Sequence, residues 1–105
     1  MAITSSVVSN TTTTRIFLAS GDQAITTIMF CNFDSATSAF LDVYAVANGG
    51  VVSTGTQILK YISLPPTETF VMDTEKLILA NGDAIWAQTS STSECVSASV
   101  SSVGI

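Results

Sequence analysis

The chain contains no histidine, and this absence removes whole classes of chemistry. Histidine is the usual base of serine hydrolase triads and of cysteine–histidine pairs. It is also a principal zinc ligand, and the two cysteines do not form a Cys-x-x-Cys motif. The acidic residues stand mostly at expected turns or strand ends, where carboxylates bind local backbone. We therefore expect a protein that is not an enzyme and that uses no metal or cofactor.

Positive charge is scarce as well. Lys and Arg number three against eight Asp and Glu, which gives a formal net charge of −5. Arg15, Lys60 and Lys76 are scattered along the chain. Binding nucleic-acid phosphates or an anionic membrane surface requires clustered Lys and Arg. The sequence thus predicts no nucleic-acid partner and no membrane partner.

Long apolar runs are missing too. No stretch reaches the about 18 consecutive apolar residues of a membrane-spanning helix. Residues 1–6 lack the positive segment and apolar stretch of a secretory signal peptide. We expect folding in a cytoplasm, where Cys31 and Cys95 remain thiols packed as small hydrophobes. A disulfide between them is the alternative, and it requires their strands to be close.

Apolar and hydroxyl side chains are what the chain has in abundance. Hydrophobic residues make up 47% and charged residues only 10%, against roughly 25% charged in an average soluble domain. The 15 serines and 15 threonines supply most of the remaining polarity. Since an isolated protein gains solubility from surface charge, two explanations stand. We favour a surface covered by neighbours in an assembly over an ordinary neutral surface.

Apolar stretches separated by turn signals predict strands along the whole chain. The turn signals recur every 8–12 residues or so, the spacing of an antiparallel sandwich or barrel. The expected strands are residues 3–8, 15–19, 23–33, 39–47, 57–64, 68–72, 77–79, 84–89 and 95–103. The prediction is a single all-β antiparallel sandwich of about eight strands, with a jelly roll or a small barrel as alternatives. Residues 1–14 form an N-terminal arm or first strand, and residues 15–105 form the sandwich domain.

Two segments refine this prediction. Residues 23–33 are the longest expected strand, and both of their faces are largely apolar, which places the strand in the centre of the fold. No stretch shows sustained helical periodicity, and residues 73–76 form one helical turn at most.

The segment Ala80-Asn81-Gly82-Asp83 predicts a tight turn between two strands. Asn81 and Gly82 tolerate the positive φ that such turns require. Asp83 is expected to hydrogen-bond local backbone. Without a histidine, a metal-binding set or a partner carboxylate, it is interpreted as a turn residue and not as a ligand or acid.

Four aromatic residues are the candidate interaction residues: Trp86, Tyr44, Tyr61 and Phe40. Aromatic rings suit a core, a subunit interface or a platform that stacks against sugars. Rings that line a groove favour sugar binding, and rings buried in a core or subunit contact favour assembly. Asp42, on the same mixed strand face as Phe40 and Tyr44, is interpreted as solvent-facing or interfacial.

A strand ending in Cys31-Asn32 precedes a Ser/Thr/Ala-rich turn, and a Leu-Pro-x-x-Glu-Thr turn and a Leu-x-x-Gly-Asp-x-Ile turn follow. In this order of segments the chain resembles a small β-sandwich found among the virion proteins of tailed bacteriophages. The pattern departs at Pro65-Pro66, where Pro-Ala is more usual, and at residues 90–93, where a Gly-containing turn is common. These departures leave the subtype open. The segments that carry the resemblance are residues 15–19, 24–32, 39–46, 58–69 and 77–87.

The resemblance implies a structural role on the head surface of a virion. In this respect the chain is similar to capsid decoration proteins, also called cement proteins, which bridge major capsid subunits and are often homotrimers. A tail, neck or fibre component with a carbohydrate-binding or adaptor role is the alternative. A clamp that bridges several subunits gains through avidity. Residues 2–14 then either add a strand to a neighbour's sheet edge or form the first strand of their own domain.

Overall fold

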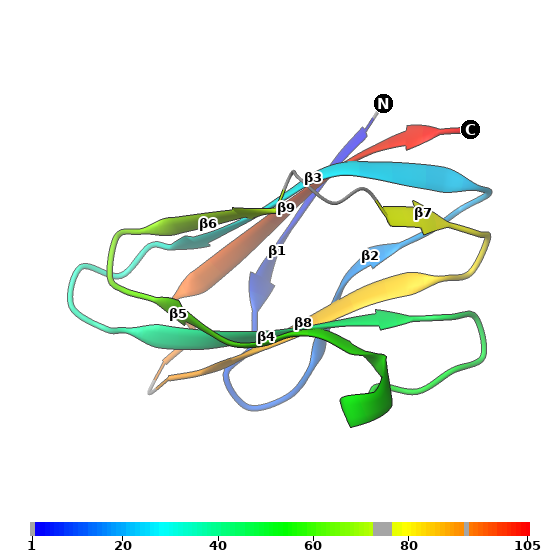
Figure 1. Cartoon of the computed structure of the whole chain (residues 1–105). Coiled ribbons are helices and arrows are strands. Elements are labelled where there is room, and N and C mark those ends of the chain that lie inside the picture. Colours follow the sequence, from blue (N-terminus) through cyan, green and yellow to red (C-terminus); the bar gives the residue numbers. More distant parts are fainter. Residues whose placement is uncertain (1, 73–76, 92) are drawn as a thin grey trace.

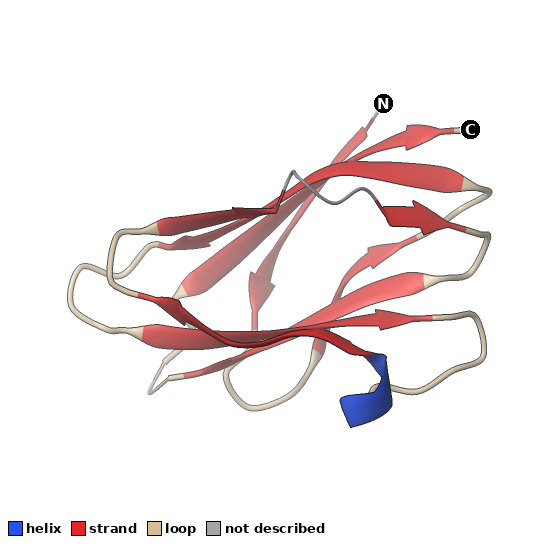
Figure 2. Cartoon of the chain, viewed as in Figure 1, coloured by secondary structure: helices blue, strands red, loops and turns tan. Residues whose placement is uncertain are grey.

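The computed structural model describes residues 2–72, 77–91 and 93–105, which form two antiparallel sheets packed face to face (Figures 1 and 2). The all-β sandwich is therefore confirmed, and each expected strand is present with its ends shifted by at most one residue. The strands are β1 (Ala2–Val8), β2 (Thr14–Leu18), β3 (Gln23–Asn32), β4 (Ala39–Val46), β5 (Gln57–Leu64), β6 (Thr69–Met72), β7 (Leu77–Leu79), β8 (Ala84–Ser90) and β9 (Val96–Gly104). The helical element in the described part is the 3-10 turn η1 (Thr54–Thr56), before β5.

The strand order identifies the type of sandwich. Sheet A has the order β1-β9-β3-β6, with β7 also paired to β3, and sheet B has the order β2-β8-β4-β5. β7 pairs with one end of β3 and β6 with the other, so these two act as one interrupted strand. Counted in this way, the described chain has eight strands in two four-stranded sheets. With successive strands mostly alternating between the sheets, this is the order of a jelly roll.

The first strand belongs to the sheet of its own chain. β1 pairs with β9 from Ala2↔Ser102 to Val8↔Val96. The chain termini therefore lie beside each other at one end of sheet A (Figure 1). β1 is an edge strand, because β9 occupies only one of its sides.

The core lies between the sheets, where alternate side chains of each strand meet. Burying each such large side chain contributes about 1.5–3 kcal/mol. The largest fully buried hydrophobic side chains are Phe30, Ile16, Ile28, Leu41, Leu64, Ile85, Val8, Val43, Val96 and Val100.

β3 occupies the centre of sheet A, between β9 and the β6/β7 pair. This central position agrees with the prediction for residues 23–33. On the outer side of the sheet Met29 is 42% exposed, so the central strand presents apolar surface outward as well as to the core. A register shift between Ile25 and Thr27 turns Ile25 and Ile28 toward the core together. The apolar residues of β3 are thus divided between the core and an open surface.

The turn at residues 80–83 is held by side chains. Gly82 has φ +90°, as expected for a glycine at a tight turn, whereas Asn81 acts through its side chain, whose Oδ1 accepts the Gly21 N–H at 2.8 Å. The Asp83 carboxylate accepts the N–H of Ala80 through Oδ2 and that of Asn48 through Oδ1, both at 2.9 Å. The turn residue Asp83 therefore ties its own hairpin to the turn at residue 48.

Both cysteines are free thiols. Cys95 is buried as expected, but Cys31 is half-buried on the outer side of sheet A and not in the core. The helical turn that the sequence allows at residues 73–76 lies outside the described residues.

Candidate functional site

All four candidate aromatic residues lie on the outer face of sheet B, which we call the aromatic face. Tyr44 on β4 and Trp86 on β8 are cross-strand partners, and Phe40 lies near the other end of β4. These three side chains are half-buried, whereas Tyr61 on β5 is 59% exposed. The structure therefore places Tyr44 opposite Trp86 across two strands and brings the rings of Phe40 and Tyr61 into contact.

A β-bulge places Tyr61. Leu41 pairs with Ile62 and Val43 pairs with Leu59, so Lys60 and Tyr61 together face Asp42. The extra residue forces Tyr61 into the left-handed region, at φ 58°. This conformation costs a non-glycine residue about 1–2 kcal/mol.

The Asp42 side chain supports the bulge. Its Oδ1 accepts the backbone N–H of Tyr61 at 2.8 Å, which satisfies a donor that the irregular pairing leaves without a strand partner. Asp42 faces outward, in agreement with its interpretation, and its role is to hold a backbone segment of β5.

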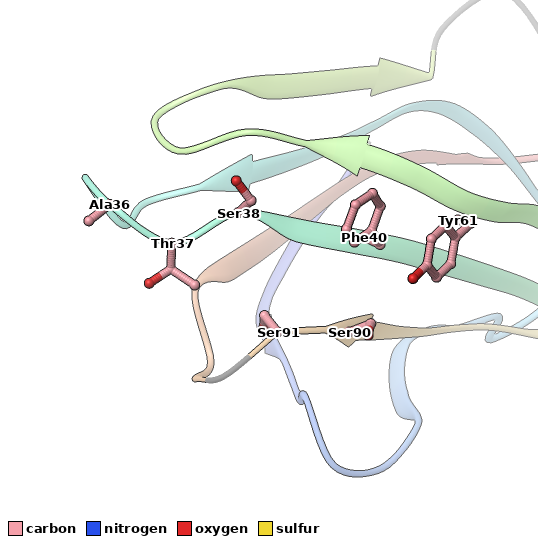
Figure 3. A pocket seen from close by; sticks show the side chains of 7 residues that line it. All are labelled: Ala36, Thr37, Ser38, Phe40, Tyr61, Ser90 and Ser91. Carbon is pink, nitrogen blue, oxygen red and sulfur yellow. The ribbon is translucent and has the colours of Figure 1, made fainter.

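The bulge brings the Tyr61 ring onto Phe40. The two rings are stacked, with centroids 4.4 Å apart and an angle of 11° between their planes. Figure 3 shows them side by side on neighbouring strands, with the serine-rich ends of β4 and β8 next to them. An aromatic pair of this kind contributes about 0.5–1.5 kcal/mol beyond its buried area.

An open hollow of about 530 Å³ lies beside the stacked pair (Figure 3). Its volume falls within the about 300–1,000 Å³ of typical ligand sites. Its lining contains hydroxyl and apolar side chains, and within the described chain no charged side chain belongs to it. The lining residues are Ala36, Thr37, Ser38, Phe40, Tyr61, Ser90 and Ser91.

Sequence reasoning identified the two rings of the hollow but not its hydroxyl residues. The bulge was missed as well, although β5 carries a signal for it. Leu59, Ile62 and Leu64 are the inward apolar residues, and the spacing of three between the first two breaks the period of two that a regular strand requires.

The buried side chain of Asn32 holds the loop that forms one side of the hollow. Its Nδ2 donates to the carbonyl oxygens of Thr37 at 2.8 Å and Leu64 at 3.0 Å. Its Oδ1 accepts the N–H of Asp34 at 3.0 Å. The residue is fully buried, and this one amide thus connects the loop at residues 34–37 to the end of β5.

Asp34 fixes the tip of the same loop. Its Oδ1 accepts the N–H groups of Ala36 at 2.8 Å and Thr37 at 3.3 Å. The hydrogen bond from Ala36 is the main cause that holds the pKa of Asp34 below its ordinary value of 3.8. The carboxylate is therefore the form that the folded loop favours.

We expect the loop to respond to pH only in acid. Because the folded-state pKa of Asp34 is lowered, its contribution to stability is present at neutral pH and lost as the pH falls through the folded-state pKa. In two-dimensional NMR, the amide signals of Ala36 and Thr37 should move together below pH 3.8, the ordinary value. The variant Asp34→Ala should lack this transition, and a transition centred above pH 3.8 would contradict the assignment.

The outer face of sheet A is the second large surface, and we call it the charge-free face. In the described part of the chain, no strand of sheet A contains Asp, Glu, Lys or Arg. Cross-strand rows run over it, such as Ser5, Ser99, Met29 and Val71. On the described strands, this face is therefore formed of serine, threonine and apolar side chains.

Large apolar side chains are well exposed on the charge-free face. Ile3 on β1 is 71% exposed and Ile78 on β7 is 65% exposed, with Val7, Met29 and Val71 between about two-fifths and a half. Sequence composition predicted a covered surface but did not say which one, because the assignment of strands to sheets depends on long-range pairing.

The described residues include no group of three or more Cys, Asp or Glu side chains placed to hold a metal ion. Among residues 2–72, 77–91 and 93–105, no helix is long and apolar enough to cross a bilayer. The arrangement offers two chemistries, apolar docking on sheet A and aromatic stacking on sheet B.

Comparison with known proteins found no similarity: no family model, no curated protein and no solved structure matches this chain.

Proposed function

We propose that this protein is a structural component of a phage virion that decorates the head, where its charge-free face docks on major capsid subunits. The observation that carries the proposal is the absence of charge from the five described strands of sheet A, combined with exposed Ile3, Met29 and Ile78. The protein would be made in the host cytoplasm and act without catalysis.

The composition of this face suits a protein interface. The buried centres of interfaces are depleted in charged residues, because removing a charge from water is costly. Removing serine and threonine side chains from water costs less free energy than removing charged ones. The short side chains of Ser97, Ser99 and Ser101 on β9 also let a partner approach the sheet closely. Ile3, Val7, Met29, Val71 and Ile78 are all exposed on this face, and exposed apolar side chains that gather on one face are typical of an interaction surface.

The link to a virion is supported by the resemblance of the chain to phage sandwich proteins, and the jelly-roll order is compatible with it. Jelly rolls also occur in lectins and enzymes, so the virion role rests on the resemblance and not on the fold. A homotrimer that places three charge-free faces on neighbouring capsid subunits would bind more tightly than a monomer, because the three contacts form simultaneously.

Locating the chain by cryo-electron microscopy of the intact particle tests this function. Copies spread over the head shell, with sheet A against the capsid subunits, are expected. A few copies at the tail or neck would reject the decoration role, and copies that face the shell with sheet B would reject the docking face.

A second candidate is a tail or fibre component that binds carbohydrate, and a specific observation favours it. The aromatic rings are not buried in the core: they lie on the outer face of sheet B, and two of them line an open hollow. This is the exposure that favours a sugar-binding role over a purely packing role for Phe40 and Tyr61.

The substitution Met29→Lys tests the charge-free face in solution. Met29 lies on the central strand β3, and a lysine there would have to be desolvated on docking. We expect at least about a tenfold loss of binding to heads that lack the protein, measured by cosedimentation, and dissociation of any oligomer in light scattering.

The matched control is Ile58→Lys, because Ile58 is about as exposed as Met29 but lies on β5 of sheet B. It should bind heads as the unmodified chain does. Equal losses from the two substitutions would show that docking does not use sheet A.

A further inference from the structure

We propose that the hollow beside Phe40 and Tyr61 binds an uncharged carbohydrate, with the stacked rings as one wall and the serine and threonine hydroxyls as its polar rim. The inference rests on the carbohydrate-binding candidate above and is independent of docking through sheet A. It adds the residues of the site and the chemical class of the ligand.

The aromatic wall suits a sugar ring. The face of an aromatic ring carries partial negative charge, and the C–H groups on one side of a pyranose carry partial positive charge, so the two stack favourably. Tyr61 is exposed enough to offer contact area, while the half-buried Phe40 supports it at a centroid distance of 4.4 Å. The hollow opens directly beside this pair.

The position of Tyr61 is held before any ligand arrives. Its left-handed backbone, at φ 58°, is a conformation that a tyrosine adopts only when its surroundings impose it. Here the bulge and the 2.8 Å hydrogen bond to Asp42 impose it. A ring fixed in this way loses little freedom on binding, which favours affinity. Strain that is maintained at an exposed residue beside a hollow indicates a functional reason for the strain.

The rim determines which class of ligand fits. Ser38 and Ser90 bring hydroxyl groups to the hollow, and a hydroxyl both donates and accepts, as the hydroxyls of a sugar do. Ser91 also lines the hollow, but its hydroxyl donates to the Ser93 carbonyl at 2.6 Å. Of the described lining residues none carries a charge, so a carboxylate, sulfate or phosphate would find no cationic partner there. The net charge of −5 opposes anionic ligands further. A neutral glycan is therefore the class that the site selects.

The test is a glycan array that carries neutral, sialylated and sulfated glycans, probed with the fluorescently labelled full chain. The neutral glycan that gives the strongest signal is then titrated in NMR. Binding of neutral glycans, with amide shifts at Thr37, Ser38, Ser90 and Ser91, is the expected result. Failure to bind any glycan, or binding of acidic glycans alone, would overturn the inference.

The variant Tyr61→Gly removes the ring at a position where glycine relieves backbone strain, so the variant is expected to fold. We expect at least about a tenfold weaker affinity for the neutral glycan. The control Tyr44→Ala removes a ring of the same face that does not line the hollow, and it should keep full affinity. Undiminished binding by Tyr61→Gly would place the sugar elsewhere and overturn the site. Neither outcome bears on the head location, which cryo-electron microscopy tests separately.

Discussion

The variant Asn32→Ala should be less stable than the unmodified protein by about 3 kcal/mol. The substitution removes three hydrogen bonds and leaves the carbonyls of Thr37 and Leu64 and the N–H of Asp34 without their partner. A buried polar group left unpaired costs about 1–3 kcal/mol, and part of this cost is recovered where the loop admits water. In thermal unfolding followed by circular dichroism, the midpoint should fall by on the order of 15 °C.

Asn10→Ala is the matched control for this effect. The Asn10 side chain also joins distant parts of the chain, but by one bond, from Nδ2 to the Ser91 carbonyl at 3.1 Å, at a half-buried position. Its loss should cost about 1 kcal/mol or less. If the two variants melted at the same temperature, the Asn32 network would not be the anchor of the loop.

The second large effect is expected for Gly82→Ala, at about 2 kcal/mol of lost stability. Alanine at φ +90° is strained, and its Cβ would lie 2.5 Å from Cγ of Asn48. The Asn48 side chain must therefore move, while its backbone N–H is tied to Asp83. Denaturant unfolding of the variant gives the free energy directly.

Two further variants separate strain from collision. Gly49 has φ +82°, and a Cβ added there would meet nothing within 4 Å, so Gly49→Ala should lose only the backbone term, about 1 kcal/mol. Adding Asn48→Ala to Gly82→Ala removes the colliding atoms. The double variant should regain the stability by which Gly82→Ala falls below Gly49→Ala. A double variant no more stable than Gly82→Ala would show that the collision contributes nothing.

Local patterns in the sequence were sufficient for the strands and for most turns. Strands such as β4 and β5 are apolar stretches that end at turn residues, and Gly82 has the positive φ that its turn motif predicts. These features depend on nearest neighbours along the chain. The sequence is therefore informative about them without knowledge of the tertiary fold.

The arrangement of strands in two sheets was not accessible in the same way. Pairing of β1 with β9 joins the two ends of the chain, and no local pattern encodes such a contact. For this reason the jelly roll stood beside a barrel as an alternative, and the apolar faces of β3 indicated a central strand without showing which face the core would cover.

The candidate site was only half predictable. Their aromatic character made Phe40 and Tyr61 candidate interaction residues, but their stacking depends on a bulge that shifts β5 against β4 by one residue. The serines of the rim come from the ends of two strands that meet only in the folded sheet. Abundant serine in the sequence does not reveal which serines gather at one place.

The charge-free face has a consequence for how the protein would meet a partner. Without Lys, Arg, Asp or Glu on its described strands, this face has no charge of its own there to steer a partner, and unsteered encounters proceed at about 10⁵–10⁶ M⁻¹s⁻¹. By the same reasoning, salt would have little charge on the face to screen. Apolar contacts strengthen on warming from the cold, because their driving force is largely entropic near room temperature. A complex held together by such contacts would stay assembled across wide changes of ionic strength. It would dissociate more readily on cooling than on an increase in salt concentration.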